Sequence, residues 1–269
     1  MTCKICSSPS EKIFEKIILQ KYNSGYYKCT SCSFVQTDEP IWLKEAYESA
    51  ITSLDLGLLA RNNYLVTEIS QIINCCFADL NTMLDYAGGY GVFVRLMRDL
   101  GYEFYRQDDY CDNLFAKHFD IEDVKIRKFD LATAFEVLEH FNDPLNEIKK
   151  VFDYSDNVIF STELVPDTNL EIENWVYIAQ ETGQHIAFYS TKTMLLIAEK
   201  FDKDYYCRNG NIHVFTSRKF TPLQIDFAFN GVTKLKRFFG LVKNRLRYKN
   251  HRESFSYKDY LHLKSILNG

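Results

Sequence analysis

An alternation of apolar runs and amphipathic stretches, beginning near residue 81, constrains the fold of this chain more than any other feature. Residues 82–86 form a short apolar run, a glycine-rich turn follows, and residues 92–100 show the apolar spacing of a helix. A strand–helix order that repeats in this way predicts an α/β fold with a mostly parallel sheet covered on both faces. The expected strands are 82–86, 103–107, 129–135 and 157–161, and the expected helices are 92–100 and 144–152.

The segment after residue 190 is expected to complete this sheet. Ser190 precedes a helical pattern over residues 191–201 and has the side chain of an N-cap. Residues 204–207 and 211–217 then read as an antiparallel hairpin, with Asn209-Gly210 in its turn.

Four of the eight cysteines form two CxxC pairs, Cys3 with Cys6 and Cys29 with Cys32, separated by 22 residues. Each pair can bend around one metal ion, and four thiolates close a tetrahedral site that has no open position for chemistry. The spacing therefore predicts a structural zinc ion, the alternative being four unrelated reduced thiols. The remaining cysteines lack metal-ligand spacing and are expected to pack in apolar surroundings: Cys75, Cys76, Cys111 and Cys207.

The turn after the first predicted strand has the composition of a cofactor-binding loop. Glycines let the backbone approach a ligand closely, and an acidic residue at the strand end can bind hydroxyl or positive groups of that ligand. Nicotinamide cofactors use similar turns, so the turn alone does not identify the cofactor. The cofactor-binding residues expected here are Asp85, Ala87, Gly88, Gly89 and Gly91.

A pair of acidic residues, Asp108 and Asp109, follows the strand 103–107, about 17 residues beyond Gly91. An acidic residue at the end of the second strand accepts hydrogen bonds from ribose hydroxyls. We therefore expect this pair to bind the ribose of a cofactor, the alternative being a solvated loop.

A second motif distinguishes between the classes of cofactor that such a glycine-rich turn can bind. The segment 129–144, FDLATAFEVLEHFNDP, resembles the fourth-strand motif of S-adenosylmethionine (SAM) methyltransferases, and it follows the turn 85–91 in the correct order. Over residues 1–220 the chain resembles the zinc-knuckle methyltransferases of bacterial surface-polysaccharide and nucleotide-sugar pathways. Three further stretches carry this resemblance: Tyr47-Glu-Ser-Ala-Ile, Leu58-Leu-Ala-Arg61-Asn62 and Gly183-Gln-His185-Ile-Ala-Phe-Tyr189-Ser190.

The resemblance implies a Rossmann-like sheet of seven strands with a small zinc ribbon before it. It also implies SAM as the cofactor, with Glu136 facing its methionine end and Arg61 holding its carboxylate, although a surface salt bridge would explain Arg61 equally. Ala87 replaces a glycine of the family motif, which the turn tolerates if the φ angle of Ala87 stays below zero. Residues 119–128 are too short and too charged to show a clear third strand, so no adenine contact is assigned.

Two histidines are candidates for the base that removes a proton from an acceptor. His140 follows the fourth strand, and His185 follows the fifth, at the edge where open α/β sheets bind ligands. Imidazole titrates near neutral pH, so either could act as the base, and a structural role is the alternative for each. Candidates for the acceptor pocket, with core packing as the alternative, are Trp175, Tyr177 and Tyr189.

The sequence thus predicts four segments: a zinc knuckle (1–40), a helical linker or lid (41–78), the SAM-binding domain (79–220) and a basic helical tail (221–269). The larger C-terminal domain of sugar C-methyltransferases is missing, which favours O-methylation. We expect a cytoplasmic enzyme that O-methylates a sugar or nucleotide-sugar in the synthesis of a bacterial surface glycan.

Other functions stay open. The chain could be a sugar C-methyltransferase, or an RNA methyltransferase that uses the knuckle and the basic, aromatic-containing run 234–249. A net charge of −4 argues against nucleic-acid binding. A scaffold with a degenerate cofactor site, or a tail that lies on a membrane or a partner enzyme, is also conceivable. The start lacks the apolar stretch of a signal peptide, and no run of about 18 apolar residues predicts a membrane span.

Overall fold

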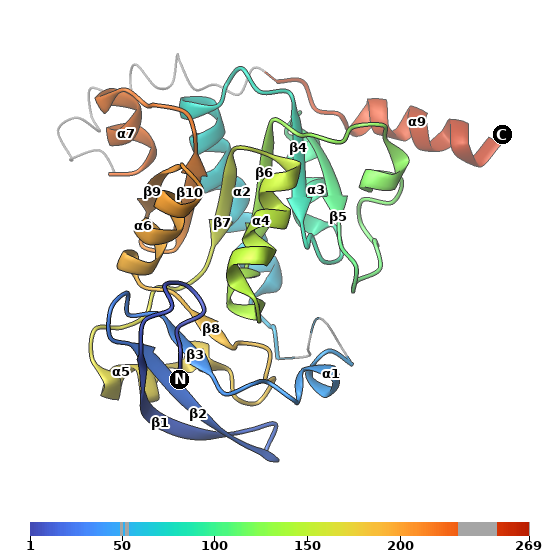
Figure 1. Cartoon of the computed structure of the whole chain (residues 1–269). Helices are drawn as coiled ribbons and strands as arrows, with labels where there is room; N and C mark the ends of the chain where they lie inside the picture. Colours follow the sequence, from blue (N-terminus) through green and yellow to red (C-terminus); the bar gives the residue numbers. More distant parts are fainter. Residues whose placement is uncertain (49–50, 52–53, 231–251, 269) are drawn as a thin grey trace. The chain divides into compact units, whose positions relative to one another are not determined.

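The protein is described by a computed structural model that covers residues 1–48, 51, 54–230 and 252–268 (Figure 1). Its internal contacts divide the chain into two compact units. The first unit comprises residues 1–53 and 134–217, and the second comprises residues 54–133 and 218–269.

The larger sheet contains β4 (Thr82–Tyr86), β5 (Glu103–Gln107), β6 (Leu131–Phe135), β7 (Val158–Ser161), β9 (Asp204–Arg208) and β10 (Ile212–Thr216). Its strand order is β5-β4-β6-β7-β10-β9. β4 pairs in parallel with β5 and β6, while β10 pairs antiparallel with β7 and β9. This mixed, mostly parallel sheet confirms the predicted Rossmann-like α/β fold.

In the part of the chain that the structure describes, this sheet has six strands, one fewer than the seven that the resemblance implied. Among the described residues, the segment between β5 and β6 contains a short 3-10 turn, Ile121–Asp123, and one isolated parallel bridge between Arg106 and Asp120. A strand in a parallel sheet needs apolar side chains on both faces, whereas residues 121–128 are mostly charged. The bridge is thus the only ladder contact that this segment makes beside β5 in the described structure.

The second unit carries the helices α2 (Leu58–Cys76), α3 (Val92–Asp99), α7 (Pro222–Ala228) and α9 (Ser256–Asn268). α2 packs against α3 and α7. A buried ion pair holds α9, because Arg98 Nη2 of α3 lies 2.7 Å from Asp259 Oδ1. The Arg98 guanidinium also lies 3.8 Å from the centre of the Phe119 ring.

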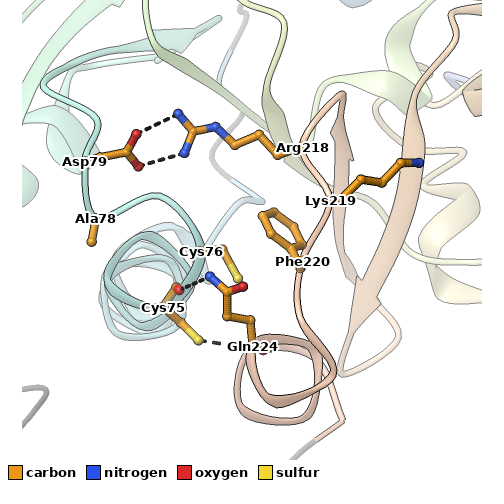
Figure 2. A pocket seen from close by; sticks show the side chains of 8 residues that line it. All are labelled: Cys75, Cys76, Ala78, Asp79, Arg218, Lys219, Phe220 and Gln224. Atoms are coloured by element: carbon orange, nitrogen blue, oxygen red, sulfur yellow. Dashed lines mark hydrogen bonds and ion pairs between the residues drawn. The ribbon is translucent and has the colours of Figure 1, made fainter.

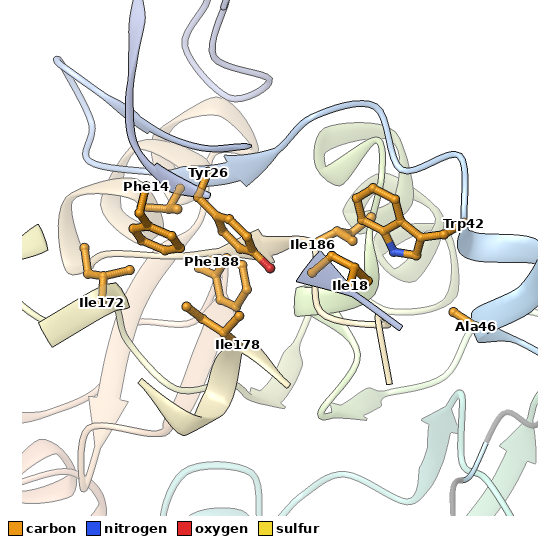
Figure 3. Packing of buried hydrophobic residues seen from close by; sticks show 10 residues of the cluster. Phe14, Ile18, Tyr26, Trp42, Ala46, Ile172, Ile178, Ile186 and Phe188 are labelled. Carbon is orange, nitrogen blue, oxygen red and sulfur yellow. The ribbon is translucent and has the colours of Figure 1, made fainter. Parts of the chain in front are cut away.

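The first unit contains a second sheet, in the order β1-β2-β3-β8. Its strands are β1 (Ser10–Ile18), β2 (Tyr22–Cys29), β3 (Val35–Thr37) and β8 (Ala187–Phe188), and each pairs antiparallel with its neighbour. Residues of this sheet contribute to the buried apolar cluster shown in Figure 3, where Phe14 stacks on Tyr26. The centres of these two rings lie 4.6 Å apart, and the Trp42 indole of the same cluster donates a hydrogen bond to the Gly183 carbonyl. Because β3 pairs with β8, residues of the predicted knuckle and of the predicted SAM-binding segment share one sheet.

The helices of the first unit are α1 (Leu43–Ala46), α4 (Pro144–Tyr154), α5 (Asn169–Glu173) and α6 (Thr191–Lys200). The Ser190 hydroxyl accepts a hydrogen bond from the Thr193 amide at 3.1 Å, which confirms the predicted N-cap of α6. The β9–β10 hairpin is also confirmed, and Asn209 and Gly210 in its turn have positive φ angles of 56° and 82°. The predicted helical linker 41–78 is not one continuous helix among the described residues, because α1 ends at Ala46 and α2 begins only at Leu58.

Within the predicted tail, α7 and α9 are helical as expected. The basic run 234–249 lies outside the described residues, so its predicted helix stays a prediction. None of the described helices is long and apolar enough to cross a membrane.

Candidate active site

The four predicted metal ligands lie together. The sulfur atoms of Cys3, Cys6, Cys29 and Cys32 are all within 4.8 Å of one another, and three pairs are separated by 3.4 to 3.6 Å. Tetrahedral zinc–thiolate bonds of about 2.3 Å place the sulfurs about 3.8 Å apart, so the cluster has the dimensions of a zinc site. Backbone amides of Ile5, Ser31 and Cys32 point at its sulfurs from 3.4 Å.

The cysteine cluster is tied to the start of α6. The Cys32 carbonyl accepts hydrogen bonds from the Ser190 hydroxyl at 2.8 Å and from the Thr193 hydroxyl at 2.9 Å. The rings of Phe34 and Tyr189 pack beside these bonds, with their centres 5.2 Å apart. The cluster is therefore linked to α6 through the loop between β2 and β3, within the first unit.

The glycine-rich turn follows β4 as predicted. Ala87, its first residue, has a φ angle of +53°, so the condition under which the turn would tolerate alanine, a φ below zero, is not met. Gly89 and Gly91 are also left-handed, at 54° and 81°. A β-carbon on Gly88 would lie only 2.8 Å from the Asp85 carboxylate, which explains why a side chain is excluded there. A strained alanine is tolerated at moderate cost when the surrounding turn fixes the backbone.

The side chain of Asp108 is hydrogen-bonded to the backbone of this turn. Its carboxylate accepts hydrogen bonds from the amides of Gly89 at 2.8 Å, Tyr110 at 2.8 Å and Cys111 at 2.7 Å. Asp109 instead accepts a bond from the Gln107 side chain at 2.9 Å. Of the two predicted ribose ligands, Asp108 is thus the one bonded to the glycine-rich turn.

Asp85, at the strand end, is 3% exposed, and its carboxylate accepts a hydrogen bond from the Thr133 hydroxyl at 2.7 Å. Burial raises the pKa of Asp85 to about 7, and the negative charge of Asp108 adds to this rise. Thr133 and the Arg106 guanidinium act in the opposite direction. Arg106 also fixes the turn, because its Nε donates to the Gly89 carbonyl at 2.7 Å.

Arg61, the predicted ligand of the cofactor carboxylate, forms a bidentate ion pair with Asp55. Its Nη1 and Nη2 atoms lie 3.1 and 2.7 Å from the two carboxylate oxygens. This ion pair corresponds to the alternative role given for Arg61 from the sequence, a salt bridge instead of a contact with the cofactor carboxylate.

A separate polar cluster in the first unit follows the end of β6. Glu136 has a positive φ of 52°, and its amide and carboxylate both bond to Ser161, with the Ser161 hydroxyl donating to Oε1 at 2.6 Å. Strained, non-glycine backbone of this kind concentrates at functional sites. Glu136, the predicted methionine-facing residue, is thereby held in one orientation by β7.

Glu139 is fully buried beside Glu136. The Tyr177 hydroxyl lies 2.6 Å from Glu139 Oε1 and 3.2 Å from Glu136 Oε2. Glu139 Oε2 is buried and has no hydrogen-bond partner among the described residues. Burial, followed by the charge of Glu136, raises the pKa of Glu139 to about 8.

The two candidate bases meet in the same cluster. The rings of His140 and His185 are perpendicular, with centres 5.0 Å apart. His185 Nδ1 lies 2.6 Å from the Tyr177 carbonyl, and His140 Nδ1 lies 3.0 Å from the Tyr47 hydroxyl. A carbonyl only accepts, so Nδ1 of His185 carries a proton and Nε2 of the neutral ring has the lone pair. Burial, followed by the nearby His185, lowers the pKa of His140 to about 3.

The three predicted acceptor residues have different surroundings. Tyr177 donates to Glu139 within the polar cluster, and Trp175 packs against its ring at 5.0 Å. Tyr189 is fully buried and its hydroxyl donates to the Leu138 carbonyl at 2.8 Å, which is the core-packing alternative.

Two members of this cluster, Glu139 and Tyr47, were not predicted as site residues from the sequence. Glu139 lies inside the fourth-strand motif next to His140, and Tyr47 opens one of the stretches that carry the resemblance. Nothing local distinguishes a buried glutamate from a solvated one, so only the fold reveals that Glu139 belongs to the site.

A groove of about 450 Å³ lies elsewhere, on the second unit, between α2 and the segment that leads into α7 (Figure 2). Arg218 forms a bidentate ion pair with Asp79 there, and Gln224 donates to the Cys75 carbonyl. None of the predicted site residues lines this groove. Because none of those residues lies there, we do not assign this groove to the cofactor.

The chain is similar to several solved methyltransferase structures. The mitomycin 7-O-methyltransferase MmcR is 14% identical, with a TM-score of 0.42 over 64% of this chain, which spans 59% of that enzyme's length. A Thermotoga maritima protein described as a possible histamine N-methyltransferase is 10% identical, with a TM-score of 0.45 over 65% of this chain and 99% of its own. An O-methyltransferase family 2 protein from Planctomyces limnophilus, in complex with apigenin, is 13% identical, with a TM-score of 0.45 over 65% and 66% of the two chains.

No curated protein matches the sequence. A family model described as a methyltransferase domain matches residues 61–206, which is more than half of the chain. The match contains the glycine-rich turn, the acidic pair after β5 and both candidate histidines. This chain therefore belongs to the methyltransferase-domain family, as the sequence predicted.

Proposed function

We propose that this methyltransferase transfers the methyl group of SAM to a hydroxyl of a sugar or nucleotide-sugar during the synthesis of a bacterial surface glycan. The observation that carries the hydroxyl chemistry is the fixed tautomer of His185, whose Nδ1 bonds to the Tyr177 carbonyl at 2.6 Å. A ring held in this way has its basic nitrogen in a defined position, as a general base requires. The sugar class rests on the sequence resemblance alone.

SAM would bind to the turn Ala87–Gly91. The left-handed residues of the turn let its backbone approach a ligand, and Asp108, already oriented by three amides, would accept hydrogen bonds from the ribose hydroxyls. Asp109 is the alternative for that role. Glu136 would face the methionine part, and Arg61 would have to exchange Asp55 for the cofactor carboxylate.

The reaction is a displacement at the methyl carbon. A bond forms between the acceptor oxygen and this carbon as the carbon–sulfur bond breaks, which leaves S-adenosylhomocysteine. The proton of the hydroxyl passes to Nε2 of His185, and water then removes it. His140 is the weaker candidate, since its pKa of about 3 makes it a poor proton acceptor at neutral pH.

We also propose that Cys3, Cys6, Cys29 and Cys32 bind one zinc ion. The sulfur separations and the surrounding amides fit a closed tetrathiolate site, whose role is structural. Zinc–thiolate bonds need reduced cysteines, so the proposed zinc site is compatible with the proposed cytoplasmic location.

The test is a screen of nucleotide-sugars for S-adenosylhomocysteine release. We expect turnover with one class of acceptor, together with formation of a methyl ether that mass spectrometry and NMR locate on oxygen. A methyl group on carbon would favour the sugar C-methyltransferase alternative. Turnover only with RNA would reject the proposal in favour of a nucleic-acid enzyme.

A further inference from the structure

We propose that Glu139, His140 and His185 form a binding site for a divalent transition-metal ion, distinct from the cysteine cluster. One ligand atom from each of these residues lies within 4.8 Å of the other two. Two imidazoles and one carboxylate are a ligand set that binds zinc or iron while leaving coordination positions open. Among the described residues, only this triad and the four cysteines bring three or more such ligands together.

The strongest support is the second oxygen of Glu139. The side chain is fully buried, Oε1 accepts the Tyr177 hydroxyl at 2.6 Å, and Oε2 has no hydrogen-bond partner among the described residues. A buried carboxylate oxygen without a partner costs free energy, and buried carboxylates are normally paired or bound to a metal. A cation bound to Oε2 would supply the missing partner.

The contacts around the triad resemble those that orient metal ligands. A histidine that binds a metal usually donates its other N–H to a carbonyl or carboxylate, which fixes the ring. His185 does this through Nδ1 to the Tyr177 carbonyl, so its Nε2 has the lone pair that an ion needs. The Tyr47 hydroxyl bonds to His140 Nδ1, and Tyr177 also orients Glu139, so two tyrosines hold all three ligands.

A metal ion here would change the role of His185 without changing the methyl transfer itself. The Nε2 atom would bind the ion instead of a proton. The ion would lower the pKa of a hydroxyl bound to it, so that the acceptor proton leaves to water. The metal site itself does not depend on methyl transfer, and its test below measures no activity.

The experiment uses the full chain loaded with zinc, incubated with excess Co²⁺ and then desalted. Zinc binds thiolates more tightly than cobalt, so zinc should stay in the cysteine cluster. We expect elemental analysis to give one zinc and one cobalt per chain, with visible d–d absorption and no thiolate charge-transfer band. Glu139→Gln and His185→Asn should each lose the cobalt and keep the zinc, whereas His118→Asn, at an exposed histidine, should keep both.

Wild-type protein that retains no metal ion beyond the one zinc of the cysteine cluster would overturn the proposal, as would folded variants that both keep the second ion. If a substitution unfolds the chain, which circular dichroism detects, X-ray absorption on the cobalt-loaded wild type decides. Imidazole nitrogen and oxygen neighbours support the site, whereas sulfur neighbours reject it. A protein that binds cobalt in this way but methylates no hydroxyl would refute the proposed function and leave the metal site standing.

Discussion

At the scale of single residues, the most informative groups are carboxyls that the fold removes from water. Asp85 combines a buried position, one hydrogen bond from Thr133 and a neighbouring negative charge at Asp108. Its pKa rises from an ordinary 3.8 to about 7. The folded state therefore keeps a proton that the unfolded chain releases above about pH 4.

This difference predicts a pH dependence of stability. Because the pKa of Asp85 is raised on folding, its contribution makes the folded state less stable as the pH rises from about 4 to 7. Asp85→Asn should remove that fall and increase the free energy of unfolding at pH 8 by roughly 2–4 kcal/mol, with little gain at pH 4. Urea unfolding at both pH values measures it. Asp109→Asn is the control, and equal pH dependence in wild type and Asp85→Asn would contradict the prediction.

His185 is the residue on which the chemistry of the proposed function depends. A positioned imidazole typically contributes about 10²–10⁴ in rate, so His185→Ala should reduce kcat at least about tenfold while SAM affinity stays nearly constant. Steady-state kinetics and calorimetry measure the two effects separately. His118→Ala, at an exposed histidine, should behave as wild type. A His185→Ala enzyme with unchanged turnover would mean that the ring is structural.

At the scale of elements, the loop between β4 and α3 depends on a side chain from another strand. Asp108, directly after β5, accepts the Gly89 amide, and Arg106 near the end of β5 donates to the Gly89 carbonyl. The conformation of the turn after β4 is thus held by residues at the end of the neighbouring parallel strand, β5. This explains how Ala87 can remain left-handed at a position where the family motif has glycine.

Asp108→Ala should therefore weaken SAM binding through both the ribose contact and the turn. Loss of the acceptor would leave the ribose hydroxyls of bound SAM without their partner, which costs about 1–3 kcal/mol, or roughly 5- to 150-fold in Kd. Calorimetry on protein with an intact circular dichroism spectrum measures this loss. Asp109→Ala should change the affinity little, and the reverse order of the two effects would assign the ribose contact to Asp109.

At the scale of the whole molecule, the cysteine cluster lies within the first unit, which also includes α6, the triad and the smaller sheet. The Cys32 carbonyl receives two hydroxyls from the start of α6. A metal ion bound by these cysteines should therefore stabilise α6 as well as the loop that contains the cysteines.

Removal of the zinc should destabilise the fold, because binding free energy at a structural site is folding free energy. We expect Cys29→Ser to lower Tm by about 10 °C, which corresponds to about 3 kcal/mol for a chain of this size, and to abolish zinc retention. Differential scanning calorimetry and elemental analysis measure the two effects. Cys75→Ser, outside the cluster, should retain the metal, and a stable Cys29→Ser protein with full zinc content would refute the assignment.

The sequence by itself determined the six strands of the larger sheet, the helices α3, α4 and α6, the glycine-rich turn and the paired cysteines. These features depend on residues close together in the chain, since strand and helix periodicity, N-caps and CxxC spacing are local patterns. The family resemblance added the methyltransferase class, which the family match over residues 61–206 confirms. It also implied a seventh strand, which the charged segment after β5 does not form.

Only the tertiary structure decided which polar residues share one site. Tyr47, Glu139 and His185 are separated by 92 and 46 positions, and no local pattern predicts that they meet. The same holds for the positive φ of Ala87, because its conformation depends on contacts of the turn with Asp108 and Arg106. Burial is a property of the folded chain, so Glu139 and Asp85 acquire their raised pKa values only when the surrounding elements exclude water from their carboxyl groups.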